Sequence, residues 1–526
     1  MHSLQGGEQR CRCGRSKQLA NYGKGFYAGE TGALMNLQNS TSTLPSIASA
    51  LPPIRKTWED ELLFAQGAKL PELYRMAVLA SGAFHVLNPK VFRDNLNAFE
   101  MVCKRHGIKS YIYFARKANK SDCWLPVVAE AGHCVDVASG EELTGALGAG
   151  IRAEDLILTG AEKSEALLTL ALRQQILISA DSPSELLRIN SLAHCLGICN
   201  VQVLLRLLPD EQPESRFGAT CAQWDEILAQ LREESQLKFD CRGVTFHLNG
   251  YSASQRIRQS HAALDYLQTL RRHGWTAEIL DIGGGFSIQY CSSAQWESFS
   301  STVLDVKDKK DYFHAGRNPE SVYPYGGQDK NGPEMLDEIL SGVKATEGRG
   351  SGVSLAKRLR DGQFRLAIEP GRSVLDGCGL SVFPVQGVKR RADYFIVTVA
   401  GLSMSLSEQW KGSEFLPDMT LWGSPGSIAE DNSKTDVNAV DGASCGPLAM
   451  CVGGASCMEY DMLTWRKVQI ERVPRIGDLL VYHNTAGYQM DKNESSFHQI
   501  RLPERFVWEG VGNLPKIDRP FYRELI

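Results

Sequence analysis

Four stretches of the sequence carry side chains that could do chemistry on a small ligand, and each follows a short apolar run. Lys117 and His247 lie in two of them, three consecutive glycines fill 283–285, and residues 369–372 read Glu-Pro-Gly-Arg. A lysine amine can hold a carbonyl carbon as a Schiff base. A glycine-rich turn presents backbone N–H groups to a phosphate, and an arginine can add a bidentate clamp.

Together these side chains would suit one particular ligand. A carboxylate such as Glu369 can face a protonated pyridine nitrogen and keep the ring an electron sink, and His247 could stack on a flat ring. Phosphate, aldehyde and pyridine describe pyridoxal 5′-phosphate. Taken singly, each residue has an ordinary explanation, because a lone lysine is usually a solvated charge and three glycines are usually a tight turn. The hypothesis therefore depends on whether the chain gathers them in one place.

An alternation of short apolar runs and helix-like segments begins near residue 110. The runs are rich in Val, Ile, Leu, Phe and Tyr, which is typical of strands buried on both faces. We predict eight strands at 111–115, 134–138, 156–159, 176–180, 201–207, 244–248, 278–282 and 364–368.

Helix signals occur between the predicted strands. Residues 254–273 have an amphipathic pattern. The connection at 181–197 starts with Ser182 as a cap, has Glu185 where a capping box needs it, and stops at Gly197. Eight β/α units in succession predict a (β/α)8 barrel of the TIM type, with an open doubly wound sheet as the alternative. In a barrel, functional side chains collect where strands end, so the candidates would share one face.

On these residues the chain resembles the barrel-type, fold type III pyridoxal-phosphate decarboxylases, the ornithine, arginine and diaminopimelate group distantly related to alanine racemase. The resemblance covers roughly residues 80–500 in order. It implies that Lys117 forms the Schiff base, that Asp136 and Glu142 support it, and that His247 stacks on the ring. Further cofactor-binding residues on this basis are Arg206, Gly283, Gly284, Gly285, Glu369, Gly371, Arg372 and Tyr488.

The sequence after Arg372 changes character. Strand-like runs occur at 382–388, 394–399, 478–482 and 505–508. With the resemblance, they imply an alanine-racemase-like fold with a C-terminal β-sandwich or β-barrel domain. The expected parts are a flexible leader at 1–50, a segment joining the β-domain at 51–85, the barrel at 86–373 with an insertion at about 303–350, and the β-domain at 374–526. The insertion is either a lid or substrate-selecting element over the barrel mouth, or a solvated excursion.

Residues 457–461, Cys-Met-Glu-Tyr-Asp, resemble the family's catalytic cysteine followed four residues later by an aspartate. In the family this loop reaches into the other subunit's site, which implies an obligate homodimer with shared active sites. Cys457 would then be the proton donor, and Glu459 and Asp461 candidate substrate-binding residues. The resemblance implies that substrate displaces Lys117 to form an external aldimine, and that Cys457 of the partner subunit protonates the quinonoid carbanion left by CO₂.

Departures from the family bear on the substrate, which we expect to be an amino acid or an amino-acid-derived metabolite. Met458 replaces the acidic residue that reads the distal amine in ornithine enzymes, and 401–406 lacks the arginine and aromatic motif of diaminopimelate enzymes. Asn249 and Gly250 stand where a phosphate-binding serine usually follows the histidine. Residues 484–488, Asn-Thr-Ala-Gly-Tyr, resemble siderophore-pathway decarboxylases that act on carboxylated conjugates of diamino acids.

Three alternatives remain open at the level of sequence. Diaminopimelate decarboxylation is one, and racemisation or epimerisation on the same scaffold is another, although a carboxylate opposite the pyridine nitrogen favours decarboxylation. The third is a non-catalytic regulator in the manner of antizyme inhibitors. Such regulators tend to lose the lysine or cofactor residues, whereas Lys117, Glu369 and Arg372 all stand here.

Composition excludes several classes of protein. The chain has 526 residues with 57 Lys+Arg against 61 Asp+Glu, and this net charge of −4 argues against a dedicated nucleic-acid binder. No apolar stretch approaches the roughly 18–20 residues of a membrane span. The 14 cysteines are too sparse and irregular for a disulfide scaffold. We expect a cytoplasmic enzyme. Cys11 and Cys13 could form a metal-binding pair, but we favour the interpretation that they belong to a flexible leader.

Overall fold

The computed structural model describes residues 48–518 apart from gaps at 49, 64–71, 234–236, 323–328, 345–351, 407, 409–412, 424–447, 512 and 514. The predicted leader with Cys11 and Cys13 thus lies, except for residues 48 and 50, outside the described residues.

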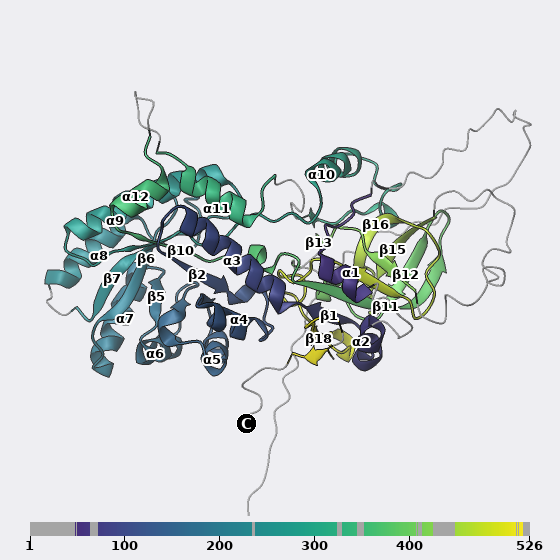
Figure 1. The fold of residues 1–526 in the computed structure, drawn as a ribbon, viewed down its shortest axis with the longest axis horizontal. Coiled ribbons are helices and arrows are strands. Elements are labelled where there is room, and N and C mark those ends of the chain that lie inside the picture. Colours follow the sequence, from purple (N-terminus) through teal and green to yellow (C-terminus); the bar gives the residue numbers. More distant parts are fainter. Residues whose placement is uncertain are drawn as a thin grey trace, which may run out of the picture. The chain divides into compact units, whose positions relative to one another are not determined.

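Eight parallel strands close into a barrel in the order β10-β2-β3-β4-β5-β6-β7-β8 (Figure 1). Their bounds are β2 Ser110–Ala115, β3 Cys134–Val137, β4 Leu156–Leu158, β5 Leu177–Ala180, β6 Val201–Arg206, β7 Phe239–Thr245, β8 Ile279–Asp281 and β10 Arg365–Ile368. Because β10 pairs with both β2 and β8, the sheet has no free edge. The predicted barrel is confirmed, and the open doubly wound sheet is excluded.

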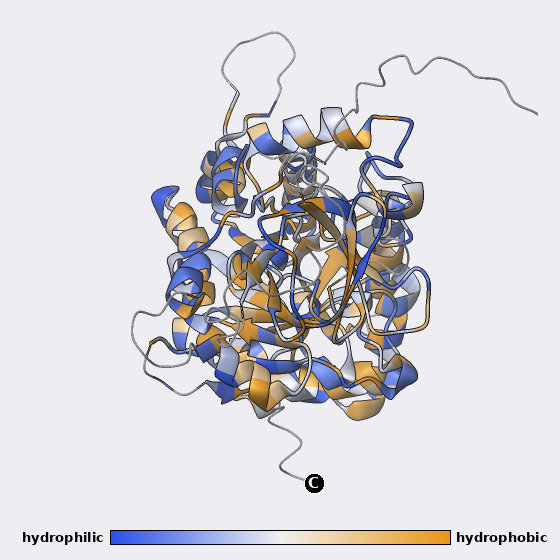
Figure 2. Ribbon diagram, turned by 90° about the vertical axis from the view of Figure 1, so that its right-hand side faces the viewer, coloured by the Kyte–Doolittle hydropathy of each residue, from blue (hydrophilic) through white to orange (hydrophobic). Residues whose placement is uncertain are grey.

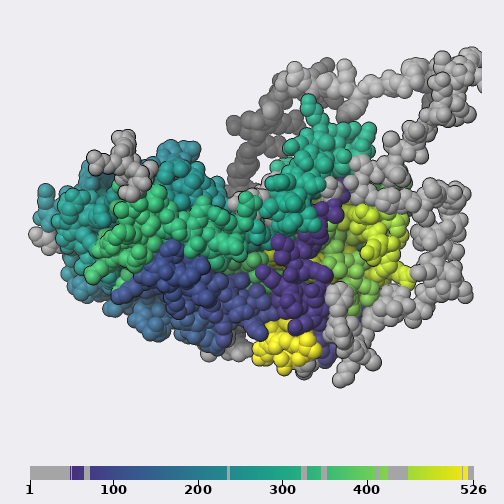
Figure 3. All heavy atoms as spheres, turned by 45° about the horizontal axis from the view of Figure 1, so that its top comes forward, coloured from purple at the N-terminus to yellow at the C-terminus, as the bar shows by residue number. Residues whose placement is uncertain are grey.

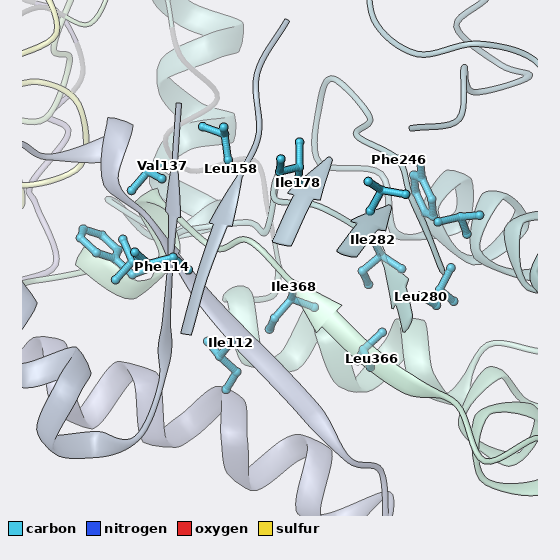
Figure 4. Packing of buried hydrophobic residues seen from close by; sticks show 14 of the residues in the cluster. Ile112, Phe114, Val137, Leu158, Ile178, Phe246, Leu280, Ile282, Leu366 and Ile368 are labelled. Carbon is cyan, nitrogen blue, oxygen red and sulfur yellow. The ribbon is translucent and has the colours of Figure 1, made fainter. Parts of the chain in front are cut away.

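Both faces of the barrel strands are buried, as the apolar runs predicted. Successive side chains of a strand point to opposite faces. On β2, Tyr113 packs in a small cluster with Ile157 and Ala367 of other strands, which fills the barrel. Its neighbours Ile112 and Phe114 belong to the large cluster that joins the strands to the helices (Figure 4).

Helices surround the barrel, and Figure 3 shows α11 beside α3 on its surface. Figure 2 shows apolar colouring on the inner strands and hydrophilic colouring on outer loops and helix faces. Within the described part of the chain, no helix has the length and apolarity that spanning a membrane requires. The bounds are α3 Pro89–Arg105, α4 Trp124–Ala131, α5 Gly140–Gly148, α6 Glu165–Gln174, α7 Pro183–Leu196, α8 Cys221–Glu233, α9 Ala253–Arg272, α11 Gly332–Ser341 and α12 Leu355–Asp361.

The strand predicted at 244–248 was placed too late in the chain. The observed β7 starts at Phe239 and ends at Thr245, so the candidate histidine lies in the following loop. The first part of the strand was missed because Asp240 and Arg242 interrupt its apolar residues. In the fold these two side chains are only partly buried, and Arg242 pairs with Glu278.

The capping box expected at α7 is half formed. Ser182 Oγ accepts the Glu185 N–H at 3.1 Å, as predicted. The Glu185 carboxylate instead accepts the Asp181 N–H at 2.8 Å and pairs with buried Lys163 at 2.9 Å. The Glu185 carboxylate pairs with Lys163 rather than with the N–H of the cap residue Ser182. An unpaired ammonium group would be costly in this buried position.

A separate mixed sheet confirms the C-terminal β-domain. Its main path is β16-β15-β12-β11-β1-β18-β19, with β17 pairing to β11 and β14. The runs predicted after the barrel correspond to β11, β12, β17 and β18, while β14, β15, β16 and β19 were not predicted. The bounds are β1 Phe84–Leu87, β11 Gly379–Arg390, β12 Phe395–Val399, β14 Thr420–Trp422, β15 Leu448–Gly453, β16 Met462–Ile470, β17 Leu479–Tyr482, β18 Glu504–Val507 and β19 Lys516–Ile517.

Segments before and after the barrel meet in this sheet. β1 precedes the barrel and pairs antiparallel with β11 and parallel with β18. Figure 3 shows the yellow C-terminal strands next to the purple segment that contains α1 (Thr57–Leu63) and α2 (Glu72–Ala80).

The predicted insertion is partly described. Val303 and Phe313 are buried in the core cluster of the β-domain, and Phe313 forms a bridge with Arg466 on β16. Its later part forms α11, which packs against α3 and α9 of the barrel. Residues 323–328 and 345–350 lie outside the described residues, and a role as a lid stays a prediction.

Candidate active site

A pocket of about 460 Å³ gathers most of the predicted residues. It lies where barrel strands end and also takes residues from the β-domain. Its lining is Lys117, His247, Leu248, Asn249, Gly250, Tyr251, Gly284, Gly285, Phe286, Glu369, Gly371, Arg372, Ser373, Glu408, Tyr488 and Lys492.

Lys117 lies in a short 3₁₀ turn, Arg116–Ala118, directly after β2. Its Nζ donates to Asp136 Oδ2 at 3.3 Å, and Thr159 Oγ1 donates to the other oxygen of this buried aspartate. The negative charge of Asp136, followed by that of Glu369, raises the pKa of the Lys117 amine. The lysine side chain still keeps 44% of its surface accessible, because it projects into the pocket.

Two buried carboxyl groups from neighbouring strands lie beside each other, and one of them, Glu369, acts on the lysine. Glu369 directly follows β10, and its N–H donates to Gly283 O at 3.0 Å. Asp281 is the last residue of β8, and its Oδ1 accepts the Gly283 N–H at 2.9 Å. Burial raises the pKa of both carboxyl groups. Asp281 was not among the predicted site residues, although its position at a strand end was a usable signal.

The three glycines are required by close packing as well as by the turn. Gly283 and Gly285 have φ values of +64° and +78°, which disfavour any other residue. A Cβ on Gly284 would lie 2.6 Å from Glu369 O, and one on Gly285 would overlap Arg256. The loop after β8 therefore approaches the neighbouring loops more closely than side chains would allow.

Arg256, on α9, was missed by sequence reasoning and holds two of these loops together. It is fully buried, and its guanidinium donates to Leu248 O, Gly250 O and Gly284 O at 3.1, 2.8 and 3.1 Å. The available signal was an arginine near the start of the 254–273 helix, beside the loop that carries the histidine.

His247 is held as a neutral ring. Burial lowers the pKa of its imidazole to about 3, and the positive charges of Lys117 and Arg206 act in the same direction. Its Nδ1 accepts the Gly284 N–H at 3.3 Å, so the ring proton lies on Nε2. A neutral, tethered imidazole lining the pocket can stack on a planar ligand.

Arg372 anchors the other side of the pocket. It donates to Gly487 O at 3.0 Å and to Tyr290 Oη at 3.2 Å, and the Tyr488 ring lies 4.8 Å from its guanidinium carbon. It also pairs with Glu408, a buried residue that sequence reasoning missed. The Tyr488 N–H donates to Ala118 O at 2.8 Å, which connects this segment of the β-domain to the lysine turn.

Four predicted cofactor residues do not line the pocket. Gly283 and Asp136 lie behind the lining residues. The Gly283 N–H donates to Asp281, and Asp136 accepts a hydrogen bond from Lys117. Glu142 accepts the Ala138 N–H at 2.8 Å, and burial raises the pKa of its carboxyl group. Arg206 donates to Asp181 Oδ1 at 3.2 Å and lies over the Phe217 ring at 4.3 Å.

The cysteine loop does not contribute to the pocket of its own chain, as far as the described residues show. Cys457 and Glu459 are exposed between β15 and β16. Asp461 is buried and accepts hydrogen bonds from Ser403 N at 2.7 Å and Ser456 Oγ at 2.7 Å, so it shapes the loop. His498, a residue not predicted, places Nε2 3.1 Å from Cys457 Sγ.

These residues fit pyridoxal phosphate. The pocket presents an amine for the aldehyde, a buried acid for the ring nitrogen, and a glycine turn with an arginine for the phosphate. Gly371 also leaves room for the cofactor. A side chain at this position would place its Cβ 3.0 Å from Tyr488 Oη and narrow the pocket.

Comparison with known proteins gives consistent matches. Residues 93–322 match the family model described as the pyridoxal-binding domain of pyridoxal-dependent decarboxylases. The chain is 34% identical to the uncharacterized protein y4yA of Sinorhizobium fredii, over 88% of this chain and 94% of that protein. It is 25% identical to a diaminopimelate decarboxylase of Aquifex aeolicus, over 66% and 72% of the two chains. The solved structure of diaminopimelate decarboxylase from Helicobacter pylori in complex with L-lysine superposes with a TM-score of 0.59 at 18% identity, covering 84% and 96%.

Proposed function

The chain belongs to the family of pyridoxal-dependent decarboxylases that includes the diaminopimelate and arginine decarboxylases, and from this premise we propose how its pocket works. It is a pyridoxal-phosphate-dependent lyase that decarboxylates an amino acid. The observation that carries the proposal is that Lys117, paired with Asp136, shares one pocket with Glu369, His247 and Arg372.

Pyridoxal phosphate supplies, when bound, an electrophilic aldehyde and a ring that accepts the electron pair left by departing CO₂. In the proposed arrangement Lys117 holds the aldehyde carbon and Glu369 holds the ring nitrogen. Arg372, Tyr488 and the glycine turn hold the phosphate. The neutral His247 covers one ring face without adding a positive charge that would compete for the electrons.

The proton that replaces CO₂ is proposed to come from Sγ of Cys457 of the partner subunit. Cys457 is exposed and does not line its own pocket, which supports a role across a subunit interface. Such a role requires a homodimer with shared active sites. Asp461 supports the arrangement by holding the cysteine loop in one conformation through Ser403 and Ser456.

We propose that the substrate is a carboxylated conjugate of a diamino acid, as in siderophore pathways. Met458 beside Cys457 offers no charge to a free distal ammonium group. Glu459 is exposed nearby, where it could contact a polar part of a larger substrate. Diaminopimelate is the competing substrate, because it is named for several relatives.

A screen for CO₂ release tests the proposal. Purified protein with added pyridoxal phosphate is assayed with diaminopimelate, ornithine, lysine, arginine and the citryl conjugates of diamino acids. Faster release from a conjugate supports the proposed substrate, and faster release from a free diamino acid contradicts it.

Lys117→Ala is the matched control for the same screen. We expect it to lose the visible absorbance of the bound cofactor and at least about a thousandfold in CO₂ release, because the lysine both binds and activates the aldehyde. A wild-type protein that binds no pyridoxal phosphate would overturn the proposal. Inversion of a stereocentre without CO₂ would favour the racemase alternative.

A further inference from the structure

Asp281 and Glu369 form a pair of buried carboxyl groups behind the pocket. Their side chains come from adjacent strands, since β8 and β10 pair in parallel with Asp281 opposite Ala367. Asp281 has no exposed surface, and Glu369 keeps 6%. Each side chain faces the other within hydrogen-bonding reach.

The hydrogen bonds around Asp281 are incomplete unless a proton lies between the two acids. Oδ1 accepts the Gly283 N–H at 2.9 Å, and the Thr245 hydroxyl also faces this carboxyl group. Oδ2 is buried and receives no hydrogen bond from an N–H or hydroxyl group of the described residues. Ionised carboxylates only accept, so Glu369 can satisfy Asp281 only by donating an O–H.

The surrounding charges favour one shared proton. Asp136 and Glu369 both act on the ammonium group of Lys117, and Asp281 adds a further negative charge beside Glu369. The hydroxyl of Tyr113 and the neutral His247 add no positive charge. Two like charges this close in a buried site are strongly disfavoured unless a further positive charge balances them, which is why one of two paired acids keeps its proton.

We propose that Asp281 and Glu369 share one proton in the cofactor-free enzyme, and that this proton passes to the pyridine nitrogen when pyridoxal phosphate binds. The Glu369 O–H bond breaks, an N–H bond forms on the ring, and both carboxyl groups end as carboxylates. The total charge of the pair and the ring is unchanged, so no solvent proton is needed. Asp281 is then a positioning residue that acts through Glu369.

Counting protons during cofactor binding tests this. Pyridoxal phosphate is added to cofactor-free protein in weak buffer with a pH-indicator dye, for wild type, Asp281→Asn and the exposed control Asp308→Asn. The amide of Asp281→Asn donates an N–H to Glu369 and keeps it ionised before binding. The ring nitrogen must then take its proton from water.

We expect Asp281→Asn to take up one proton per site more than wild type, and Asp308→Asn to match wild type. Equal uptake in wild type and Asp281→Asn would overturn the inference. Other proton movements, at Lys117 and at the phosphate, occur in all three proteins and cancel in the comparison.

Infrared spectroscopy keeps the inference testable if Asp281→Asn does not fold. Cofactor-free wild type should show the carbonyl stretch of a protonated carboxyl group that is absent from Glu369→Gln, and cofactor binding should remove it from wild type. Identical spectra for wild type and Glu369→Gln would contradict the shared proton. CO₂ release by wild type in either case would leave the decarboxylase assignment intact, so the two failures are distinguishable.

Discussion

The acidic neighbours of Lys117 raise the pKa of its amine. An amine attacks an aldehyde only when it is unprotonated, yet Asp136 and Glu369 both stabilise its charged form. Asp136 also holds the side chain in place, because its Oδ2 accepts a hydrogen bond from Lys117 Nζ at 3.3 Å. The contact that orients the Lys117 side chain thus also raises the pKa of its amine.

Asp136→Asn should separate these two effects. Removing the largest stabilising charge lowers the pKa of Lys117, while the amide keeps nearly the same shape. We therefore expect covalent attachment of pyridoxal phosphate to begin at lower pH than in wild type, by about one pH unit or more. Absorbance titration with pH measures this, with Asp308→Asn as the control, and an unchanged or higher midpoint would contradict it.

The contact between His498 and Cys457 predicts a reactive thiol. His498 has a positive φ of 58°, which is uncommon for a residue other than glycine, and it places Nε2 3.1 Å from Sγ. An imidazole at this distance can take up the thiol proton as the sulfur reacts. We expect His498→Asn to slow alkylation of Cys457 about threefold to tenfold at neutral pH.

Mass spectrometry of labelled peptides follows each cysteine separately in that experiment. Cys195 and Cys199 are also exposed, and they serve as internal controls whose alkylation rates should not change. Equal rates for Cys457 in both proteins would show that the contact does not influence the thiol.

At the scale of elements, the loops after β7 and β8 form one rigid unit. Arg256 of α9 bonds to carbonyl groups in both loops, and Gly284 binds His247 Nδ1 through its N–H. These hydrogen bonds therefore hold His247 and the glycine turn in a fixed relation to each other. Through Arg256, helix α9 thus fixes the distance between His247 and the glycine turn, which are proposed to hold the ring and the phosphate of the cofactor.

Gly284→Ala should break this unit. Its Cβ would lie 2.6 Å from Glu369 O, so the turn or the Glu369 backbone must shift. We expect pyridoxal phosphate affinity to fall by at least about tenfold, which corresponds to roughly 1.4 kcal/mol. Fluorescence titration measures the affinity, and Gly145→Ala is the control because a Cβ there meets nothing within 4 Å. Similar affinities for the two variants would argue against a tight turn.

At the scale of the whole molecule, mixing two inactive variants tests the proposed shared sites. Lys117→Ala and Cys457→Ala are unfolded together, refolded and assayed for CO₂ release. A mixed dimer has one site in which both residues are intact. With random pairing about half of the dimers are mixed, so the specific activity should reach about a quarter of the wild-type value. If each site used its own Cys457, mixing would restore nothing.

The sequence by itself determined the barrel and half of the residues that line the pocket. Buried parallel strands are continuously apolar, and functional side chains follow where they end, so both signals are local. Lys117, His247, Glu369 and Arg372 were all found in this way, and they line one pocket. Strand β7 was misplaced because Asp240 and Arg242 interrupt its apolar pattern and only the fold gives them partners.

The tertiary structure decided which additional residues act on those found from sequence. Each of these residues contacts a predicted residue that is distant in the chain; they are Asp281, Arg256, Glu408 and His498. A carboxyl, guanidinium or imidazole group changes its pKa and role with burial and neighbours, and neither is encoded locally. The sequence therefore determines which chemical groups stand at the strand ends, and the packing of distant segments determines their protonation and orientation.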